Sequence, residues 1–505
     1  MQTQSAREWQ QHPFRLDQCD DLTPLRQALE AVGYSQQALS DTAKRQSRTE
    51  PLDMEVILRR TVAPTPFNTL THLFFLGQTV SVAAARAALA PMQVEPLVAV
   101  GLLQQVETGM RATAMIFPYE GLFVAYDFPT DITRNPLPED YVLGVGGASI
   151  TLDHLTVRRQ GETVLDLGTG SGVHALLAAQ HATRVVATDL NPRALNVAGL
   201  NARLNGLTTV TLRQGSLYEP VAEEQFDLIV ANPPFVISPE SRYIYRDSDL
   251  PGDTISEHVI RGAPARLRHD GYGVVLCNWY HQRDQIWSER PRQWVEACGC
   301  DVWILCFNSE DPLTYAASWL RASEGKNPQR YGQLLDEWLA YYQRMGIDYV
   351  NSGAVIFRKR TGRNWIRTDE VPSGRGVGSC SAQIQRIFAA QDLLESLTHE
   401  DQLLDQRLVL PPEHRLEHIL KAEDGDWSVK ETVLKQEQGL EFTGQVDRLV
   451  ATVLAGCDGR HALREMIADV ARGLGVEFTT VAPPSLRVIR ELMQLGFLSV
   501  VEPHR

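Results

Sequence analysis

Residues 162–172 read Glu-Thr-Val-Leu-Asp-Leu-Gly-Thr-Gly-Ser-Gly, a short apolar run that ends in three alternating glycines. Apolar side chains then recur at helical spacing over residues 171–182. A strand that passes through a glycine loop directly into a helix is typical of a parallel α/β sheet. The glycines let backbone approach a ligand closely, and the helix start adds its amides. Taken alone, the loop is equally compatible with a simple tight turn.

Short apolar runs alternate with helical stretches across residues 135–370. This alternation predicts a mainly parallel sheet covered by helices on both faces, with ligands bound beyond the carboxyl ends of the strands. The seven expected strands are residues 162–167, 184–188, 209–212, 226–231, 273–277, 302–307 and 353–357.

A second loop, Asp189-Leu-Asn-Pro192, follows the second expected strand. A carboxylate at this place, about 20 residues beyond the glycines, can accept hydrogen bonds from both hydroxyls of a ribose. Asn191 could equally serve as the N-cap of the next helix. The two loops together leave two candidate ligands, a dinucleotide and S-adenosylmethionine.

The third loop, Asn232-Pro-Pro-Phe235, follows the fourth expected strand and narrows the choice. The prolines fix the backbone, so the Pro233 carbonyl and the Asn232 side-chain oxygen can both accept from one NH2 group. Phe235 offers a flat face for a planar group. This arrangement suits a planar amine or amide nitrogen as a methyl acceptor, whereas a hydride-transferring enzyme has no use for it.

On these residues the chain resembles the class I S-adenosylmethionine-dependent methyltransferases, and among them the group with an Asn-Pro-Pro-aromatic motif. That group includes release-factor glutamine, ribosomal-RNA guanine-N2 and adenine-N6 methyltransferases. Val-Leu-Asp-Leu-Gly-Thr-Gly-Ser-Gly at 164–172 is most similar to the glutamine group, whereas Phe235 is similar to the guanine-N2 group. The resemblance, which covers residues 140–280 well, implies a Rossmann-like, seven-stranded methyltransferase core and leaves the acceptor open.

The resemblance also implies roles for individual residues. Asp166 and the glycines would line the methionine and ribose of the cofactor, and Asp189 would bind the ribose hydroxyls. Residues 144–149 would close over the methionine end, while Ser216 stands where many relatives place an acid near the adenine. The expected catalytic residues are Asn232, Pro233, Pro234 and Phe235. The expected S-adenosylmethionine contacts are Asp166, Gly168, Thr169, Gly170, Gly172, Asp189, Leu190, Ser216, Leu217 and Asn232.

The outer parts of the chain share a weak repeat, in which an apolar helical stretch, a glycine and a strand-like run follow one another at residues 96–107 and 486–502. This order is typical of the passage from the third helix into the wing of a winged-helix module. It predicts either nucleic-acid binding or a protein-docking module. The expected helices are residues 67–76, 82–89 and 94–100 in the first module and 445–455, 461–474 and 485–495 in the last.

Three domains are therefore predicted. Residues 1–130 form a helical, winged-helix-like domain, residues 135–370 the methyltransferase domain, and residues 375–505 an α+β domain that ends in a winged-helix-like module. Within the central domain, residues 308–351 are a long, aromatic-rich insertion. The insertion is either a substrate lid or a helical pair that packs against an outer domain.

Several charged or reactive residues have weaker interpretations. Cys298, Cys300 and Cys306 read as a turn and a buried strand without further zinc ligands, so we expect core thiols and no metal. We expect His174 and His258 to have structural roles and not to act as a general base. The basic cluster could meet RNA phosphate or be a solvated face; it comprises Arg358, Lys359, Arg360, Arg363 and Arg367. The two histidines near the loops are His174 and His258.

The composition is that of an ordinary globular protein, with 43% hydrophobic and 22% charged residues among 505. A formal net charge of −14 argues against broad, non-specific nucleic-acid binding. Seven cysteines are too few for a disulfide scaffold. We expect a cytoplasmic protein without a membrane span, because the sequence has neither a secretory pattern at its start nor an apolar run of about 18 residues.

Together these features predict an S-adenosylmethionine-dependent N-methyltransferase that acts on the translation machinery. Its acceptor is either an exocyclic amine of an RNA base or a glutamine amide of a protein, docked by the outer domains. One alternative is methylation of a peptide or small metabolite that the C-terminal module docks. Another is a non-catalytic binding scaffold. The sequence predicts no oligomeric state.

Overall fold

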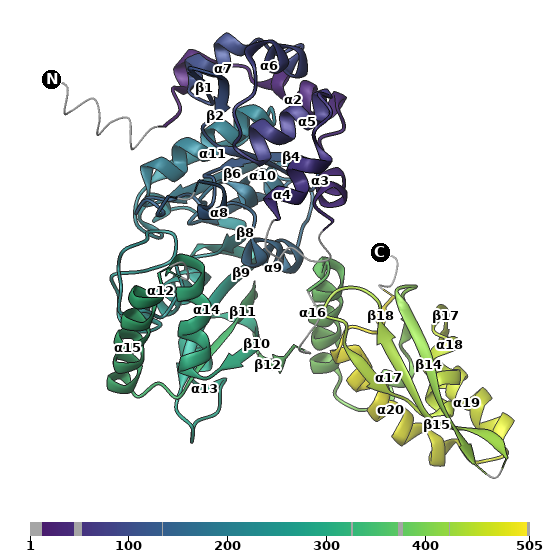
Figure 1. The fold of residues 1–505 in the computed structure, drawn as a ribbon. Coiled ribbons are helices and arrows are strands. Elements are labelled where there is room, and N and C mark those ends of the chain that lie inside the picture. Colours follow the sequence, from purple (N-terminus) through teal and green to yellow (C-terminus); the bar gives the residue numbers. More distant parts are fainter. Residues whose placement is uncertain are drawn as a thin grey trace. The chain divides into compact units, whose positions relative to one another are not determined.

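The computed structural model separates the protein into two compact units (Figure 1). The first comprises Met1–Leu152 and Arg158–Glu370, and the second Asp153–Val157 and Val371–Arg505. Within the described residues, no helix is long and apolar enough to cross a membrane. The structure describes residues 13–44, 53–133, 135–324, 327–371, 377–423 and 425–501.

The centre of the first unit is an eight-stranded sheet in the order β12-β10-β11-β9-β8-β5-β6-β7. Neighbouring strands from β9 to β7 are parallel, and β12 is parallel to β10, whereas β11 is antiparallel to β9 and β10. The predicted mainly parallel α/β fold is therefore confirmed. The strands are β5 (Thr163–Leu167), β6 (Arg184–Asp189), β7 (Val210–Gln214), β8 (Phe226–Ala231), β9 (Leu267–His281), β10 (Cys300–Glu310), β11 (Tyr349–Lys359) and β12 (Ile366–Glu370).

The edge strand β12 corrects the prediction of seven strands. Its sequence, Ile-Arg-Thr-Asp-Glu, has a single apolar side chain, so alternation of apolar and polar residues does not reveal it. It is held by backbone pairing with β10 and by its polar side chains. The Trp303 indole donates to Asp369 at 2.6 Å, and the Arg367 guanidinium lies 5.3 Å from the centre of the Trp303 ring.

Helices cover both faces of the sheet, as the alternating sequence predicts. The side chains that these helices turn inward pack with the nearly continuous apolar runs of β5, β8 and β9. The helices that follow the strands are α10 (Val173–Ala179), α11 (Pro192–Leu204), α12 (Thr254–Gly262) and α13 (Glu289–Val295), and those before β5 are α8 (Thr130–Thr133) and α9 (Gly147–Leu155).

The N-terminal segment packs on the elements of the central sheet as part of the same unit. Two asparagines carry this contact, Asn201 within α11 and Asn205 at the C-cap of that helix. Asn201 accepts from the Ala125 amide at 2.7 Å and donates to its carbonyl at 2.8 Å, and Asn205 pairs with Phe123 in the same way. Since Asn201 also donates to the Ser171 carbonyl at 2.8 Å, it ties the N-terminal segment to the glycine loop.

The predicted helices of this segment are present, and a hairpin follows the third. Gly101, with φ of +91°, ends α7 in the left-handed region. The helices are α2 (Thr23–Ala31), α3 (Gln36–Ala43), α4 (Met54–Arg60), α5 (Pro66–Leu70) with a π-helical turn (Thr71–Phe75), α6 (Val82–Leu89) and α7 (Val94–Val100). The strands form two hairpins, β1 (Leu103–Val106) with β2 (Gly109–Ala112) and β3 (Met115–Tyr119) with β4 (Leu122–Tyr126).

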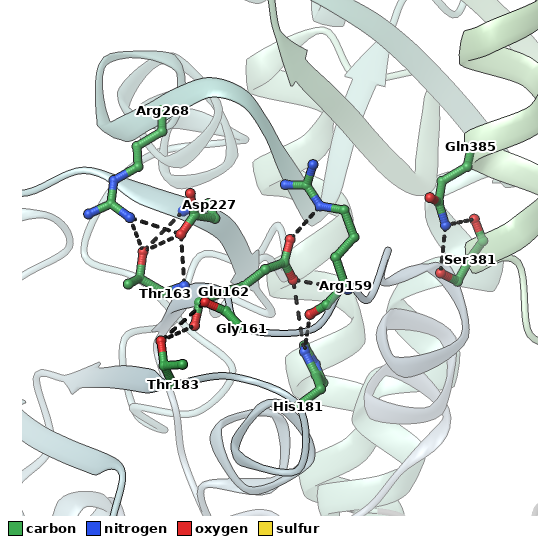
Figure 2. A network of polar contacts seen from close by, with 10 residues as sticks. All are labelled: Arg159, Gly161, Glu162, Thr163, His181, Thr183, Asp227, Arg268, Ser381 and Gln385. Atoms are coloured by element: carbon green, nitrogen blue, oxygen red, sulfur yellow. Dashed lines mark hydrogen bonds and ion pairs between the residues drawn. The ribbon is translucent and has the colours of Figure 1, made fainter. Parts of the chain in front are cut away.

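A polar network joins the amino ends of two central strands (Figure 2). The Thr163 amide and hydroxyl donate to one Asp227 oxygen at 2.8 and 2.7 Å, and Arg268 pairs with the same oxygen at 2.9 Å. Beside it, Arg159 donates to Glu162 at 2.6 Å. The network fixes the start of β5 against β8, at the opposite end of these strands from the three predicted loops.

The insertion between β10 and β11 is a helical pair, α14 (Pro312–Glu324) and α15 (Pro328–Met345). Its apolar side chains pack on the segment that follows the Asn-Pro-Pro-Phe loop, including Val236 and Ile237. The pair therefore supports a loop of its own domain, where the sequence suggested a lid or packing against an outer domain.

The second unit combines short helices with two three-stranded sheets, β17-β13-β18 and β14-β15-β16. Its last helix begins earlier than predicted and runs through Pro483 and Pro484. The helices are α16 (Ser381–Ser396), α17 (Asp401–Leu404), α18 (Arg448–Ala455), α19 (Leu463–Leu474) and α20 (Phe478–Gln494). The strands are β13 (Arg407–Val409), β14 (His414–Glu423), β15 (Asp426–Gln436), β16 (Thr443–Gln445), β17 (Asp458–Ala462) and β18 (Ser499–Val500). A winged-helix function for either module stays a prediction.

Candidate active site

A cavity of about 480 Å³ lies at the carboxyl ends of β5, β6, β7 and β8. This is the edge at which open parallel sheets bind their ligands. The loop after each of these four strands contributes to its wall. Of the predicted site residues, the cavity is lined by Gly168, Thr169, Gly170, Asp189, Leu190, Ser216, Leu217, Asn232, Pro233 and Pro234.

The glycine loop forms the floor of this cavity with its backbone. Gly168 and Gly170 have φ of +71° and +55°, which residues with a side chain rarely adopt. A Cβ added at Gly170 would meet no atom within 4 Å, so the space beside this glycine is free for a ligand. The loop is held from below, where the Thr169 amide donates to the Thr188 carbonyl at 2.9 Å.

Two residues predicted to contact the cofactor lie behind the loop. Asp166 is 1% exposed, accepts from the Thr169 hydroxyl at 2.5 Å and from the Ala175 amide at 3.0 Å, and is not among the residues that line the cavity. Gly172 is needed for packing, because an added Cβ would lie 2.9 Å from that of Ala198 on α11. Both therefore position the loop.

Asp189 ends β6 at the mouth of the glycine loop. Its two carboxylate oxygens accept from the amides of Gly170 and Asn191, each at 2.8 Å. Burial raises the pKa of this carboxyl, and the two amide hydrogen bonds oppose the rise. Each oxygen keeps a further lone pair that can accept a hydroxyl, so the geometry fits the predicted contact with a ribose.

The loop after β7 brings Ser216 and Leu217 to the cavity. Leu217 has φ of +47°, a strained value for a leucine, and strain of this kind is common at ligand sites. Leu190, which is 60% exposed, lines the same cavity. The two leucines give it an apolar wall suited to a flat, weakly polar group such as a purine.

The Asn-Pro-Pro-Phe loop closes the cavity after β8. Asn232 is half-buried, and its side chain has no hydrogen-bond partner within the described chain. The Pro233 carbonyl accepts from the Phe235 amide at 2.8 Å and keeps its second lone pair. Phe235 differs from the prediction, because it packs against the helical pair α14–α15 and does not line the cavity.

The segment after this loop is clamped by two buried tyrosines of the helical pair. The Tyr315 hydroxyl accepts from the Ile237 amide at 3.1 Å and from the Asn278 side chain at 2.7 Å. The Tyr342 hydroxyl donates to the Ile237 carbonyl at 2.8 Å. Both backbone polar groups of Ile237, three residues beyond Pro234, are thus fixed from the insertion.

A buried ion pair shapes the next turn of the same segment. The Arg246 guanidinium is 2% exposed and contacts Asp247 at 2.8 Å and Glu240 at 3.1 Å. Asp247 also accepts from the Tyr243 amide at 3.1 Å, and Arg246 lies 5.6 Å from the Trp338 ring centre. The segment is therefore rigid where Asp247 reaches the cavity wall.

The remaining wall of the cavity was missed by the sequence analysis, which expected only residues 144–149 there. Two segments meet over the cavity: the Ile244 amide donates to the Glu139 carbonyl at 3.1 Å, and the rings of Tyr141 and Tyr245 lie 5.5 Å apart. The aromatic residues that follow the Asn-Pro-Pro-Phe loop in the sequence could have indicated that this segment contributes to the wall. The two segments contribute Tyr141, Val142, Leu143, Gly144, Ser149, Ser241, Ile244, Tyr245, Asp247, Ser248, Asp249 and Leu250.

The basic cluster and the clustered cysteines do not line this cavity, whereas the two predicted histidines do. Arg358 and Arg360 pair with the same buried Asp301 carboxylate at 2.6 and 3.3 Å, so this part of the basic cluster is partly compensated within the chain. Among the described residues, no three His, Cys, Asp or Glu side chains are arranged to hold a metal. Cys300 and Cys306 belong to β10 and are buried in the core. His174 and His258 line the cavity.

The match to known sequences falls on the domain that carries this cavity. Residues 146–286, which include all three predicted loops, match the family described as methyltransferase small domain. The central domain is therefore similar in sequence to a methyltransferase family. The matched residues lie within the stretch predicted to form a methyltransferase domain, and the match supports S-adenosylmethionine as its cofactor. Residues 47–113 and 385–500 match two families described as domains of unknown function.

Curated proteins are similar in sequence to a part of this chain. The ribosomal protein uL3 glutamine methyltransferase of Bradyrhizobium diazoefficiens is 36% identical over 30% of this chain and 51% of its own. The release factor glutamine methyltransferase of Xylella fastidiosa is 39% identical over 25% of this chain and 50% of its own. The release factor glutamine methyltransferase of Geobacter sulfurreducens is 46% identical over 30% of this chain and 54% of its own. The chain spans about half the length of these relatives.

Proposed function

We propose that this protein transfers a methyl group from S-adenosylmethionine to a glutamine side-chain amide of a protein of the translation machinery. The observation that carries the proposal is the free Asn232 side chain beside the Pro233 carbonyl, at the wall of a cavity whose floor is the glycine loop. Glutamine is the acceptor named in the relatives of the methyltransferase domain. An RNA amine is disfavoured, because two arginines of the basic cluster are already paired with Asp301.

The bound cofactor supplies an electrophilic methyl group on a sulfonium. The chain itself aligns the acceptor: the Asn232 side-chain oxygen and the Pro233 carbonyl each accept one hydrogen of the amide NH2, which directs the nitrogen lone pair into the cavity. Alignment of this kind supplies much of the rate acceleration in such transfers. The same two oxygens stabilise the positive charge that develops on the nitrogen. A proton on the methylated nitrogen is acidic enough to leave to water.

Labelled S-adenosylmethionine tests the proposal. The protein is incubated with methyl-labelled cofactor and, in separate reactions, with purified release factor, ribosomal protein uL3 and a cell extract. We expect label that protease releases and nuclease does not, located on glutamine by mass spectrometry. Label only in nucleic acid or in small molecules would refute the proposed acceptor.

Substitution of Asn232 separates catalysis from cofactor binding. We expect Asn232→Ala to lower the transfer rate by about 100-fold or more, the usual cost of losing one stabilising group, while calorimetry still detects S-adenosylmethionine binding. Asn308→Ala is the matched control, because Asn308 is exposed and does not line the cavity. Full activity of Asn232→Ala would overturn the assigned role.

A further inference from the structure

The hairpin of β14 and β15 in the second unit exposes an unusual amount of apolar surface. Five of the thirteen large hydrophobic residues that are exposed in the described chain lie on these two strands. Trp427 is 69% and Val429 54% exposed. Concentrated exposure of this kind marks a surface that associates with something else. The five residues are Leu416, Ile419, Leu420, Trp427 and Val429.

β14 is also an edge strand. It pairs with β15 on one side, and no other described strand pairs with it on the other. From Leu416 to Glu423, every residue except Glu417 is exposed, and Glu417 is half-buried. Proteins usually block such edges with short strands, proline or charge. This edge is ten residues long, contains no proline and carries charges of alternating sign.

The charges of β14 are arranged symmetrically about Ile419. Glu417 and Lys421 stand two residues to either side of it, and Arg415 and Glu423 four residues to either side. Side chains alternate along a strand, so all five share one face. Each charge thus has the opposite charge at the mirror position, which makes the strand complementary to its own antiparallel copy.

We propose that β14 pairs antiparallel with β14 of a second copy of this chain, with the two Ile419 residues opposite each other at a twofold axis. Glu417 then faces the partner's Lys421, and Arg415 faces the partner's Glu423. Opposite residues in an antiparallel pair lie about 5 Å apart, within reach of such contacts. The interface is isologous and closed, as a twofold dimer requires.

The opposite face of the strand fits the same register. Leu416 faces the partner's Ala422, and His418 faces the partner's Leu420. Trp427 and Val429 pair with Ala422 and Leu420 across the hairpin, so they extend this face on each side of the twofold axis. The exposed apolar residues of this face, which do not include Ile419, would then lie next to one another across the two copies.

Shifted registers are disfavoured by charge. Moving the partner strand by two residues in one direction places Arg415 opposite the partner's Lys421, and in the other direction places Glu417 opposite the partner's Glu423. Like charges directly opposite destabilise a strand pair. The alternating pattern therefore selects one register and an antiparallel direction.

Sedimentation equilibrium of the full chain tests the proposal. We expect a monomer–dimer equilibrium at concentrations up to about 100 μM, the range of weak interfaces, with the dimer fraction falling as salt is added. Lys421→Glu should abolish the dimer, because the new carboxylate would face the partner's Glu417 at both symmetric positions. Lys421 has no ion-pair partner within the described chain, so its loss should not disturb the fold of one copy. Lys44→Glu, with the same change of net charge in the first unit, should leave it intact.

A mixing experiment distinguishes loss of the β14–β14 pairing from misfolding of the variants. Glu417→Lys should also be monomeric alone, since two lysines then face each other across the axis. Mixed with Lys421→Glu, it should form a heterodimer in which each pair is again opposite in charge. A monomeric wild-type protein, or a wild-type dimer that survives Lys421→Glu, would refute the proposal, as would a mixture of two folded variants that stays monomeric.

Chemical cross-linking locates the axis. A cysteine introduced as Ile419→Cys should be joined to that of a second copy by a short bis-maleimide, giving a covalent dimer. The wild-type protein, whose Cys19 and Cys298 are partly exposed, is the control for background cross-linking. A cross-linked fraction no greater than that of the wild-type protein would contradict the placement of Ile419 at the axis.

Discussion

Asp166 shows how a single buried carboxyl supports the glycine loop. Burial raises its pKa from 3.8 to about 7, while hydrogen bonds from Thr169 and Ala175 lower it. In the unfolded chain the carboxyl ionises at its ordinary value. Between these two values the folded protein holds a proton that the unfolded chain has lost, so the contribution of Asp166 to stability falls as pH rises.

The raised pKa of Asp166 makes the stability of the protein depend on pH. We expect the unfolding midpoint of wild type, relative to that of Asp166→Asn, to fall as pH rises from 5 to about 7 and to change little above that, since both states of the chain are then ionised. Urea unfolding of both proteins across this range measures the difference. Asparagine keeps one oxygen for the Thr169 hydroxyl. A difference that is flat with pH, or that rises, would contradict the assignment.

Tyr245, and not the Phe235 of the motif, presents an aromatic ring to the cavity. Phe235 packs against the helical pair, whereas Tyr245 lines the cavity beside Tyr141. Because Asn232 and Tyr245 line the same cavity, we expect a planar acceptor group held at Asn232 to stack on the ring of Tyr245. Stacking of aromatic groups contributes about 0.5–1.5 kcal/mol beyond the area that it buries.

We therefore predict that Tyr245→Leu raises the KM for the methyl acceptor about five- to tenfold, the equivalent of roughly 1 kcal/mol of stacking. Phe235→Leu should change this KM less and should lower stability by about 1 kcal/mol, as a change of shape in a packed cluster does. Steady-state kinetics and thermal unfolding of the two variants check this. The reverse order of KM effects would return the stacking role to Phe235.

At the scale of elements, the helical pair α14–α15 supports the segment that follows the Asn-Pro-Pro-Phe loop. Its two tyrosines bind both polar groups of the Ile237 backbone. The indole N–H of its Trp338 donates to Glu240 at 3.2 Å. Loops that carry function are usually fixed by a rigid scaffold. Here the scaffold lies between the sixth and seventh strands of the sheet in sequence and beside the fourth-strand loop in space.

Tyr342→Phe tests this support. The change removes the hydroxyl that donates to the Ile237 carbonyl and should cost about 1–2 kcal/mol, because a buried acceptor loses its partner. We expect a lower kcat for methyl transfer with an unchanged Kd for S-adenosylmethionine. Tyr331→Phe, on the same helix and half-buried, is the matched control. Equal losses in kcat and in cofactor affinity would indicate general unfolding of the site.

At the scale of the whole molecule, the chain consists of two compact units, of which the first contains the cavity. The N-terminal segment belongs to the first unit through Asn201 and Asn205. A ligand that binds only the folded state of one unit stabilises that unit by mass action. Unfolding of such a chain need not be a single transition.

We predict two thermal transitions, of which S-adenosylmethionine raises one. At a cofactor concentration about 100 times its Kd, the gain for the first unit is about 2.7 kcal/mol. Differential scanning calorimetry with and without the cofactor measures the shift. Asp189→Ala should lose the shift while it keeps both transitions. A single transition, or equal shifts of both, would show that the units unfold together.

The sequence by itself determined the mainly parallel sheet, the three loops at its carboxyl edge and the methyltransferase domain. Apolar periodicity and glycine loops are local, and each strand of the central sheet that was predicted overlaps an observed strand. The polar strand β12 was missed because backbone pairing with β10 alone reveals it. Likewise, α20 continues through two prolines because its apolar face, which includes Val481 and Ile489, is buried.

Tertiary structure alone decided how the site is completed. The direction of Phe235, the wall made by Tyr141 and Tyr245, and the clamp on Ile237 depend on contacts between residues far apart in the chain. Asp166 and Gly172 read as ligand contacts in the motif, yet their neighbours turn them into supports of the loop. Sequence patterns report the period of local structure, whereas the side of a loop that faces a ligand is set by what packs against its other side.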